Sequence, residues 1–360
     1  MRAEDGIPDL RMADQPRNTS GEMPLANAAP TRSFPVADPP HTARAVWYTA
    51  PGTVEIRSCT LPPVAAGQAL VRTAFSGISR GTERLVISGA VGQLEWERMR
   101  APLQEGAFPF PVKYGYCATG TVEEGPDALK GRSVFCLHPH QDRFLAPVEM
   151  LVPIPNGVPL RRATLAANME TALNAVWDSG ASAGDRIVIV GAGIVGLLVA
   201  YLAARLPSAD VTVVDVADRS GIVTSLGAGF GAPADAPRNA DVVFHTSASP
   251  PGLATALACA GLEGTVVELS WYGDKDVAAP LGGAFHSQRL RLQSSQVGQV
   301  SASRRPRWSY RRRMEKALEL LADPALDALV SDEIAFDDAA VELPRILAPG
   351  AMGLAPVIRY

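Results

Sequence analysis

The sequence predicts an α/β fold in which a doubly wound parallel sheet, with helices on both faces, follows a β-rich module. Three observations support this prediction. Short strand-like segments separated by Gly and Pro fill residues 43–146, which is typical of a β-rich module. From residue 186 to residue 293, apolar β-branched segments alternate with helical segments, as in right-handed βαβ units. A length of 360 residues is sufficient for two domains.

Residues 186–205 have the pattern of a buried strand, a glycine turn and a helix in direct succession. The four apolar residues 187–190 are too few for a helix and suit a central parallel strand. Glycines then follow with the spacing Gly-x-Gly-x-x-Gly, which allows a tight turn, close approach of a pyrophosphate and close packing of helix on strand. The helix N-terminus directs free N–H groups and its positive dipole end at the phosphates. We therefore expect a dinucleotide to contact Gly191, Gly193, Ile194, Val195 and Gly196.

A second strand, residues 211–215, ends in a carboxylate that makes the glycine pattern more specific. Asp215 follows the glycines by roughly 20 residues, the spacing at which an acidic side chain meets the adenosine ribose. A carboxylate accepts ribose hydroxyls and repels a 2′-phosphate, so Asp215 favours NAD over NADP. Arg219 lies near enough to pair with such a phosphate, although stacking on adenine or pairing with Asp215 or Asp218 is the preferred interpretation.

Two other interpretations of the glycine segment remain open from these residues. Residues 187–204 are almost wholly apolar and about as long as a bilayer crossing. A nucleoside-binding methyltransferase also combines a glycine turn with an acidic strand end. The glycine spacing and the flanking βα units favour the dinucleotide-binding interpretation over both.

Composition excludes several classes of partner. A net charge of −4 with 19% charged residues shows no basic excess, so we expect no nucleic acid ligand. The Arg-rich run at residues 304–313 is predicted to be a solvated helix start, with an anionic ligand as the alternative. The four cysteines are widely spaced, which argues against a disulfide framework and fits reduced thiols in the cytoplasm. Residues 1–42 lack an apolar segment, so we expect a disordered arm rather than a signal peptide, with Met23 as an alternative start.

The order of elements sets the predicted domain boundaries. Residues 167–295 form the dinucleotide-binding domain, and residues 43–166 together with 296–360 form the β-rich domain. The tail after a last helix at residues 314–321 has strand character but no further βα pair, so we expect it to return to the β-rich domain. Within these domains the predicted strands cover residues 43–48, 53–57, 68–75, 116–122, 133–137, 142–146, 187–190, 211–215, 241–246 and 264–270, and the predicted helices cover residues 167–177, 219–228 and 252–260.

From Ala43 to Tyr360 the chain resembles the medium-chain dehydrogenase/reductase family, whose members join a GroES-like catalytic domain to a Rossmann domain. The segments that carry the resemblance are residues 75–83, 111–122 and 191–196. The sequence Gly-Ile-Ser-Arg-Gly-Thr-Glu at residues 77–83 is similar to a branch near the bacteriochlorophyllide dehydrogenases, which oxidise a side-chain hydroxyl. The resemblance implies hydride transfer with a nicotinamide cofactor, and it makes a homodimer an expectation.

The chain departs from this family at the zinc ligands. By resemblance, the three ligand positions are occupied by Ser79, Tyr116 and Ala167, and a hydroxyl, a phenol and a methyl group do not supply the ligands that zinc prefers. We therefore expect no zinc. A shifted site remains an alternative because neighbouring segments carry four zinc-capable side chains: Cys117, His138, His140 and Glu170.

Without a metal, side chains must bind the substrate oxygen and move its proton. By resemblance, Ser79, Tyr116 and Cys117 line the space of the metal, with Glu83 and the loop 137–142 beside it. We expect His138 and Tyr116 to carry the proton, since a histidine titrates nearest neutrality. An ordinary loop role is equally open for His138 and His140, and packing or turn hydrogen bonding is favoured for Ser79 and Cys117.

Further cofactor contacts follow from the order of elements. Thr171 touches the cofactor by resemblance, and Glu170 either does so or is a carboxylate stabilised at a helix start. Ser247 and Trp271 follow two strands of the parallel sheet, at the carboxyl edge where doubly wound folds bind ligands.

The predicted function is zinc-independent, NAD-dependent interconversion of a primary or secondary alcohol and its carbonyl compound. We expect a small-molecule substrate, a cytoplasmic location and no membrane partner. Two alternatives remain: an NADPH-dependent quinone or enone reductase, and a non-catalytic nucleotide-sensing homologue.

Overall fold

The computed structural model describes residues 41–360 of the chain, and most of the predicted disordered arm lies outside them. His41 and Thr42, which the prediction placed in that arm, belong to the first strand. The strands are β1 His41–Ala50, β2 Thr53–Leu61, β3 Gln68–Gly77, β4 Glu105–Gly106, β5 Val112–Lys113, β6 Ala118–Glu124, β7 Ser133–Cys136, β8 Arg143–Pro147, β9 Val152–Pro153, β10 Arg186–Val190, β11 Asp210–Val214, β12 Gly229–Gly231, β13 Ala240–His245, β14 Ala260–Glu268, β15 Arg291–Ser294, β16 Glu333–Ala335 and β17 Val357–Arg359. The α-helices are α1 Arg80–Ser88, α2 Leu160–Ala163, α3 Ala166–Ser179, α4 Ile194–Ala203, α5 Ser220–Ser225, α6 Pro250–Cys259, α7 Tyr310–Leu320 and α8 Ala339–Ile346.

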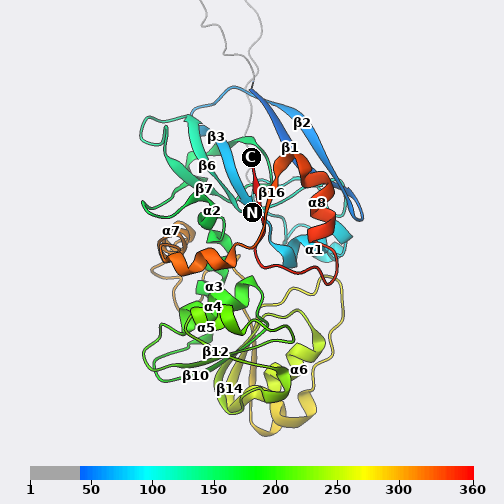
Figure 1. Ribbon diagram of the computed structural model, residues 1–360, viewed down its shortest axis with the longest axis vertical. Helices are drawn as coiled ribbons and strands as arrows, with labels where there is room; N and C mark the ends of the chain where they lie inside the picture. Colours follow the sequence, from blue (N-terminus) through cyan, green and yellow to red (C-terminus); the bar gives the residue numbers. More distant parts are fainter. Residues whose placement is uncertain (1–40) are drawn as a thin grey trace, which may run out of the picture. The chain divides into compact units, whose positions relative to one another are not determined.

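The parallel sheet has the order β12-β11-β10-β13-β14-β15, and every neighbouring pair is parallel, which confirms the predicted doubly wound sheet (Figure 1). Alternate residues of the central strand β10 enter two different cores, as the two-residue period of a strand requires. Ile187 and Ile189 pack with α3 and α4, whereas Val188 and Val190 pack with the apolar face of α6. Apolar residues on both faces explain why this strand reads as a continuous apolar run.

The β-rich module consists of two sheets. A seven-stranded sheet has the path β16-β17-β3-β6-β7-β9 with β8 paired to β3, and a smaller sheet has the order β2-β1-β5-β4. The C-terminal strand β17 is antiparallel to β3 and parallel to β16, so residues 357–359 lie beside a strand almost 300 positions earlier in the chain. Most predicted strands of this module are observed, with ends that differ by a few residues.

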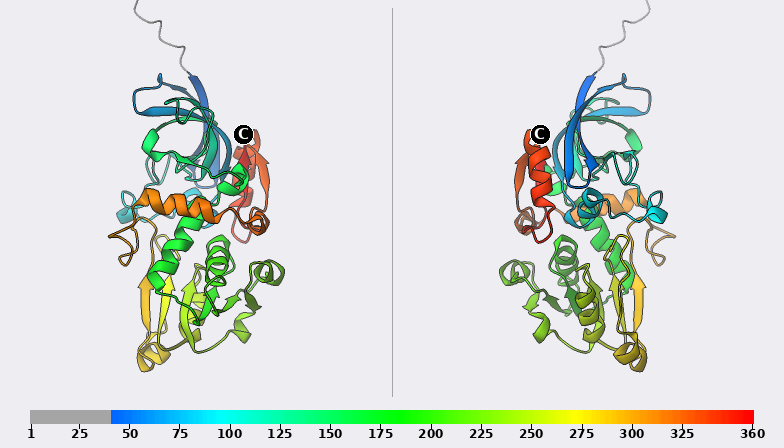
Figure 2. Two further views of the ribbon diagram at one scale, coloured as in Figure 1. Left: turned by 90° about the vertical axis from the view of Figure 1, so that its left-hand side faces the viewer. Right: turned by 90° about the vertical axis from the view of Figure 1, so that its right-hand side faces the viewer.

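Helix α7 crosses α3, the helix that precedes the glycine turn (Figure 2). It begins four residues before its predicted start at Met314, because Ser309 caps its N-terminus by accepting a hydrogen bond from Arg312 N at 3.1 Å. Met314, Ala317 and Leu318 join the same apolar core as α3 and α4. This core also contains Phe135 and Val152 of the β-rich module, so helix α7 packs against both parts of the chain.

Within residues 41–360, no helix combines the length and the apolar character that a bilayer crossing requires. The apolar segment that raised this alternative divides into β10, a turn, and α4 of ten residues.

Candidate active site

The three glycines of the turn have three different surroundings. Gly191 has φ +113°, and a Cβ there would lie 2.7 Å from Ser247 N, so side chains are excluded by both conformation and space. At Gly196 a Cβ would lie 1.9 Å from the Gly191 carbonyl oxygen, which is the close helix-to-strand packing expected of the third glycine. Around Gly193, by contrast, no described atom lies within 4 Å of the Cβ position, so the N-terminus of α4 opens onto free space.

Asp215 lies at the edge of this open turn. Its Oδ2 accepts a hydrogen bond from Ala192 N at 2.5 Å, and its Oδ1 accepts one from Ala217 N at 2.8 Å. These bonds hold the carboxylate beside the glycine turn, where the sequence placed it. A carboxylate in this position has the chemistry to accept the hydroxyls of an adenosine ribose.

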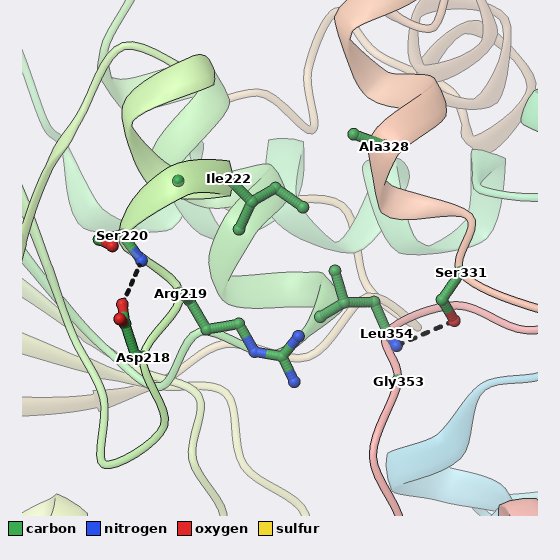
Figure 3. Close-up of a pocket in the computed structure, with 9 residues that line it drawn as sticks. Asp218, Arg219, Ser220, Ile222, Ala328, Ser331, Gly353 and Leu354 are labelled. Carbon is green, nitrogen blue, oxygen red and sulfur yellow. Dashed lines mark hydrogen bonds between the residues drawn. The ribbon is translucent and has the colours of Figure 1, made fainter.

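A pocket lies against the segment that follows Asp215 in the chain, and both Asp218 and Arg219 line it (Figure 3). Its volume is about 400 Å³, and Arg219 extends into it toward Gly353 and Leu354. Arg80 of α1 lies close by and donates to the Gly353 carbonyl at 2.5 Å. Burial, together with the positive charges of Arg84 and Arg219, lowers the pKa of Arg80. Clustered guanidinium groups beside a pocket favour an anionic ligand.

At the carboxyl edge of the sheet, a polar network lies under the glycine turn. Thr246 Oγ1 donates to the Gly191 carbonyl at 2.8 Å, and Ser247 Oγ is 2.7 Å from His245 Nε2. His245 Nδ1 is 2.7 Å from Glu268 Oε2. Burial opposes ionisation of Glu268, but hydrogen bonds with His245 and Ser270 outweigh it and lower the pKa of the carboxyl.

Sequence reasoning missed His245 and Glu268. The available signal was a polar residue at the last position of each of two strands, directly after the apolar residues 242–244 and 266–267. Trp271, a predicted cofactor contact, is partly buried and packs against the apolar core that contains Val86 and Val91 of the β-rich module.

Ser79 and Tyr116 lie together where the resemblance places two zinc ligands. Ser79 precedes α1, and Tyr116 is half-buried in the segment between β5 and β6. Burial and the neighbouring Cys117 raise the pKa of Tyr116, against hydrogen bonds with the side chains of Ser79 and Thr82 that lower it. Tyr116 therefore keeps its proton at neutral pH, and it has hydroxyl groups beside it.

Behind these hydroxyls, Glu83 is completely buried in the first turn of α1. Its Oε1 accepts a hydrogen bond from Ser79 N at 2.7 Å. Its Oε2 accepts one from the Tyr48 hydroxyl at 2.7 Å and lies 3.0 Å from His140 Nε2. The structure thus brings together Glu83 and His140 of the loop 137–142, two parts of the chain that the resemblance placed beside the same space.

His138, the preferred proton carrier of the sequence prediction, has different surroundings. Its ring stacks on Phe144 with 3.9 Å between centroids, and its Nδ1 is 2.8 Å from the Pro139 carbonyl oxygen. Burial is the main cause that lowers the pKa of His138 to about 3. A buried imidazole with so low a pKa is a poor proton acceptor near neutrality.

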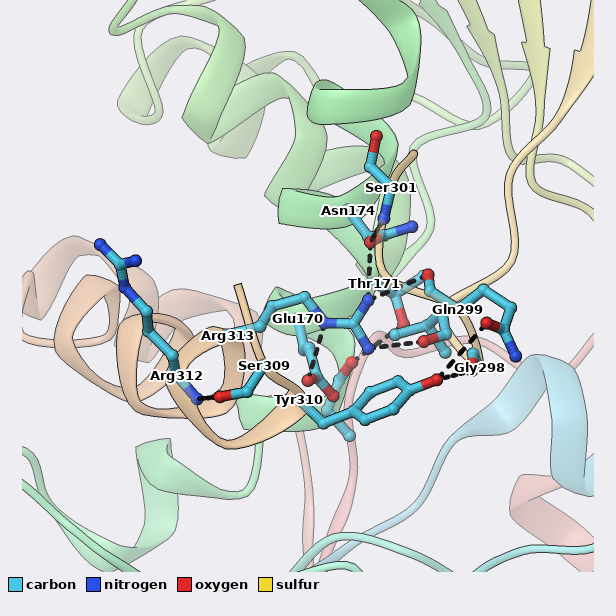
Figure 4. A network of polar contacts seen from close by, with 12 residues as sticks. Glu170, Thr171, Asn174, Gly298, Gln299, Ser301, Ser309, Tyr310, Arg312 and Arg313 are labelled. Atoms are coloured by element: carbon cyan, nitrogen blue, oxygen red, sulfur yellow. Dashed lines mark hydrogen bonds and ion pairs between the residues drawn. The ribbon is translucent and has the colours of Figure 1, made fainter. Parts of the chain in front are cut away.

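Glu170 and Thr171 of α3 both form hydrogen bonds within the protein, Glu170 to helix α7 and Thr171 within its own helix (Figure 4). Glu170 Oε1 accepts a hydrogen bond from Arg313 Nε of α7 at 2.9 Å, and Arg313 also donates to Asn174 Oδ1 at 2.6 Å. Burial raises the pKa of Glu170, against the opposing effect of Arg313. Thr171 Oγ1 donates to the Ala167 carbonyl at 2.9 Å. Glu170 therefore joins α3 to α7 as one half of a buried ion pair.

The donor set at the expected metal position does not fit zinc. Ser79, Tyr116 and Ala167 offer a hydroxyl, a protonated phenol and a methyl group. Among residues 41–360, no three His, Cys, Asp or Glu side chains gather into a group suited to a metal ion. The alternative set of Cys117, His138, His140 and Glu170 is dispersed, because Glu170 is bound to Arg313 and His138 stacks on Phe144.

Comparison with known proteins identifies the same fold in several dehydrogenases. Residues 189–250 match the family model for an NAD(P)-binding Rossmann-like domain. L-idonate 5-dehydrogenase from Escherichia coli has a similar structure, with a TM-score of 0.74 and 16% identity over 89% of this chain and 99% of that one. A putative zinc-binding dehydrogenase from Sinorhizobium meliloti, bound to NADP, has a TM-score of 0.71 and 19% identity over 89% of this chain and 100% of that one. The 2R,3R-butanediol dehydrogenase from Bacillus subtilis has a TM-score of 0.70 and 18% identity over 88% and 99%.

Proposed function

We propose that this chain, which has the fold of the zinc-type medium-chain alcohol dehydrogenases, is an oxidoreductase that interconverts an alcohol and its carbonyl compound with NAD and without catalytic zinc. The observation that carries the proposal is the position of Asp215. Its carboxylate is held on the backbone of a glycine turn whose second glycine faces open space. This arrangement has room for a diphosphate and a hydrogen-bond acceptor for a ribose.

Different residues of the chain would bind the different parts of the dinucleotide. Gly193, Ile194 and Val195 at the start of α4 would hold the diphosphate, and Asp215 would hold the adenosine ribose. Ser247 and Thr171 are assigned to the nicotinamide half, because they lie at the carboxyl edge of the sheet and on the helix beside it. The bound dinucleotide supplies or accepts the hydride.

Tyr116 is the proposed partner of the substrate oxygen. Its raised pKa keeps the hydroxyl protonated, so it can donate a hydrogen bond to a carbonyl oxygen. During carbonyl reduction, Tyr116 gives its proton to that oxygen and is reprotonated from solvent, and alcohol oxidation follows the same two proton transfers in reverse. Ser79 supports this group, and Cys117 lines the buried side of the same space. His138 does not enter the proposal, because its ring is buried against Phe144 with a pKa of about 3.

The zinc-free proposal rests on ligand chemistry. A hydroxyl and a phenol that keeps its proton are weak ligands for a metal that prefers imidazole, thiolate and carboxylate. Metal analysis of the purified protein tests this part. One tightly held zinc per chain, retained through dialysis, would refute it.

The preference for NAD rests on Asp215, whereas Arg219 supplies the specific observation for the alternative. Arg219 follows Asp215 by four residues and lines a pocket in which a 2′-phosphate would pair with its guanidinium. An NADPH-dependent quinone or enone reductase is therefore the second candidate.

Two measurements test the proposed function. Fluorescence titration with NADH and with NADPH measures which cofactor binds more tightly. Absorbance at the nicotinamide band, followed during incubation with a panel of alcohols, ketones and activated alkenes, measures which substrates are turned over. We expect tighter binding of NADH and turnover with alcohols or ketones. Tighter binding of NADPH with turnover of alkenes would favour the reductase, and binding without turnover would favour a nucleotide sensor. Binding of neither cofactor would contradict the proposal.

A further inference from the structure

A chain of hydrogen bonds leads from Glu83 to the last residue of the protein. Glu83 Oε2 is 3.0 Å from His140 Nε2, and His140 Nδ1 is 2.7 Å from Ser76 Oγ. Ser76 Oγ is in turn 2.8 Å from the Tyr360 hydroxyl. Four side chains from α1, β3, the loop after β7 and the C-terminus thus form one continuous series of three hydrogen bonds.

Every link of this series can have the same polarity. The Tyr360 hydroxyl donates to Ser76 Oγ, Ser76 donates to His140 Nδ1, and His140 donates from Nε2 to the carboxylate of Glu83. Each intermediate group carries both a donor and an acceptor in its neutral form. A uniform polarity of this kind is what proton transfer along a hydrogen-bonded chain requires.

The two ends of the series differ in access to solvent. Ser76, His140 and Glu83 are completely buried. Tyr360 is a partly exposed residue that lines a surface pocket of about 480 Å³ together with Arg44 and Asp142, and burial of its phenol raises the pKa of the hydroxyl. The other donor to Glu83 Oε2, Tyr48, is also completely buried. The only exposed member of the series among the described residues is therefore Tyr360.

Packing keeps the groups aligned. A Cβ on Gly115 would lie 2.9 Å from the His140 ring, so the ring rests directly on the backbone there. The backbone of His140 donates to the Tyr114 carbonyl and accepts from Val46 N. Tyr360 stacks on Phe336 with 4.7 Å between ring centroids. These contacts fix the donor and acceptor atoms before any proton moves.

We propose that Tyr360, Ser76 and His140 carry protons between solvent and the buried carboxylate of Glu83. Tyr360 takes a proton from water in the surface pocket as it gives its own to Ser76, Ser76 protonates His140 Nδ1, and His140 Nε2 releases its proton to Glu83. One proton enters, the charge of Glu83 is neutralised, and no other bond changes. Reversal returns the proton to solvent.

Proton transfer along this path would change the charge of Glu83 beside the proposed substrate site. The titratable groups that face Glu83 are Tyr48, Tyr114, Tyr116, Cys117, His140 and Tyr360. Burial is the main cause that raises the pKa of the four tyrosines and of Cys117, and the negative charge of Glu83 raises each of them further. Protonation of Glu83 through the path removes this effect from Tyr116, the group to which the proposed function assigns the substrate proton. The path itself is independent of that assignment.

The test follows the Nε2 proton of His140 by NMR in the full-length protein labelled with ¹⁵N-histidine. The chain has only five histidines, so assignment by single substitution is practical. We expect Tyr360→Phe to slow exchange of this proton with water by about tenfold or more, because buried groups exchange only through such paths or through local opening. Ser76→Ala should slow it as well, and the double variant should be no slower than the slower single variant, because the links are in series.

Tyr48→Phe is the matched control, because it removes a hydroxyl from the same carboxylate oxygen at a position off the path. It should not slow exchange. If the series were only structural, Tyr360→Phe would loosen the packing and leave exchange unchanged or faster, and either result would overturn the proposal. Tyr360→Phe alone decides the matter if Ser76→Ala fails to fold. No cofactor is present in this experiment, so its outcome is separate from that of the proposed function.

Discussion

Single residues in the glycine turn have separable roles. Gly196 is required by packing, since any Cβ there meets the Gly191 carbonyl, whereas Gly193 leaves space that no described atom occupies. Asp215 and Tyr116 are likewise individual groups whose chemistry, rather than their packing, supports the proposed function.

Substitution of two glycines by alanine should separate binding from folding. Gly193→Ala is expected to leave stability unchanged and to weaken NADH binding, because its methyl group enters the open space before α4. Gly196→Ala is expected to lower the free energy of unfolding by about 1–3 kcal/mol through overpacking. Urea unfolding and NADH titration of both variants measure the two effects. Equal effects on folding would show that the space at Gly193 is not a ligand site.

Asp215→Asn should weaken NADH binding by about tenfold, or about 1.4 kcal/mol, because an amide is a weaker acceptor for the ribose hydroxyls. Removal of the negative charge should also reduce discrimination against NADPH. Asp210→Asn, at the exposed opposite end of β11, is the matched control and should bind both cofactors as the unsubstituted protein does. A change of the same size in the control would reject the role of Asp215.

Tyr116→Phe should lower kcat by roughly 10²–10⁴-fold, the usual contribution of a positioned acid or base, while the affinity for NADH stays the same. Tyr114→Phe is the control, because this buried phenol lies 6.0 Å from Tyr116 between ring centroids. Steady-state rates and cofactor titrations on both variants provide the comparison. An unaltered kcat in Tyr116→Phe would assign the substrate proton to another group.

Between elements, the contact of α3 with α7 determines where Glu170 points. Its carboxylate is buried and bound to Arg313, which also donates to the Gln299 carbonyl at 3.1 Å (Figure 4). One guanidinium group therefore joins two helices and the loop that precedes α7. The pair positions α3, the helix beside the glycine turn.

Arg313→Met should lower the free energy of unfolding by about 3–5 kcal/mol at neutral pH, since it leaves the buried Glu170 charge unpaired. The pKa of folded Glu170 already lies above its ordinary value, so the folded state binds the proton more tightly than the unfolded state. Stability from this group is then present at low pH and is lost as pH rises through the folded pKa. The stability deficit of the variant should accordingly shrink as the pH falls, because loss of Arg313 raises the folded pKa of Glu170 further and Glu170 is then more readily protonated.

Arg312→Met is the control for this substitution. Arg312 is exposed and stacks over Trp308, so its loss should cost about 1 kcal/mol or less. Its deficit should not depend on pH between 5 and 7. Chemical unfolding of both variants at several pH values measures these losses of stability. The same pH dependence in both variants would contradict the ion-pair account.

Across the whole molecule, the candidate site draws on both modules. Arg80 comes from α1 of the β-rich module, and Arg219 follows β11 of the Rossmann module, yet the two lie near enough that burial, the charge of Arg84 and the charge of Arg219 together lower the pKa of Arg80. A ligand that contacts both would stabilise the folded chain as a unit.

NADH at 100 times its dissociation constant should therefore raise the free energy of unfolding by about 2.7 kcal/mol, as linkage requires for a ligand of the folded state. Zinc added in excess over the protein should not raise the free energy of unfolding, because the residues at the metal position are poor zinc ligands. Thermal unfolding with each addition measures both effects. Stabilisation by zinc that EDTA reverses would restore a metal to the site.

The sequence by itself determined the parallel sheet, the glycine turn and the position of Asp215, because these depend on backbone conformation and periodicity over a few neighbouring residues. The pairing of β17 with β3, the ion pair of Glu170 with Arg313 and the series from Glu83 to Tyr360 were decided only by the tertiary structure. Their partners lie far apart in the chain. Likewise His138 and His140 are two positions apart and alike in sequence context, but packing stacks one on Phe144 and brings the other to Glu83. Burial and long-range partners set the chemistry of a side chain, and neither is encoded in the local pattern.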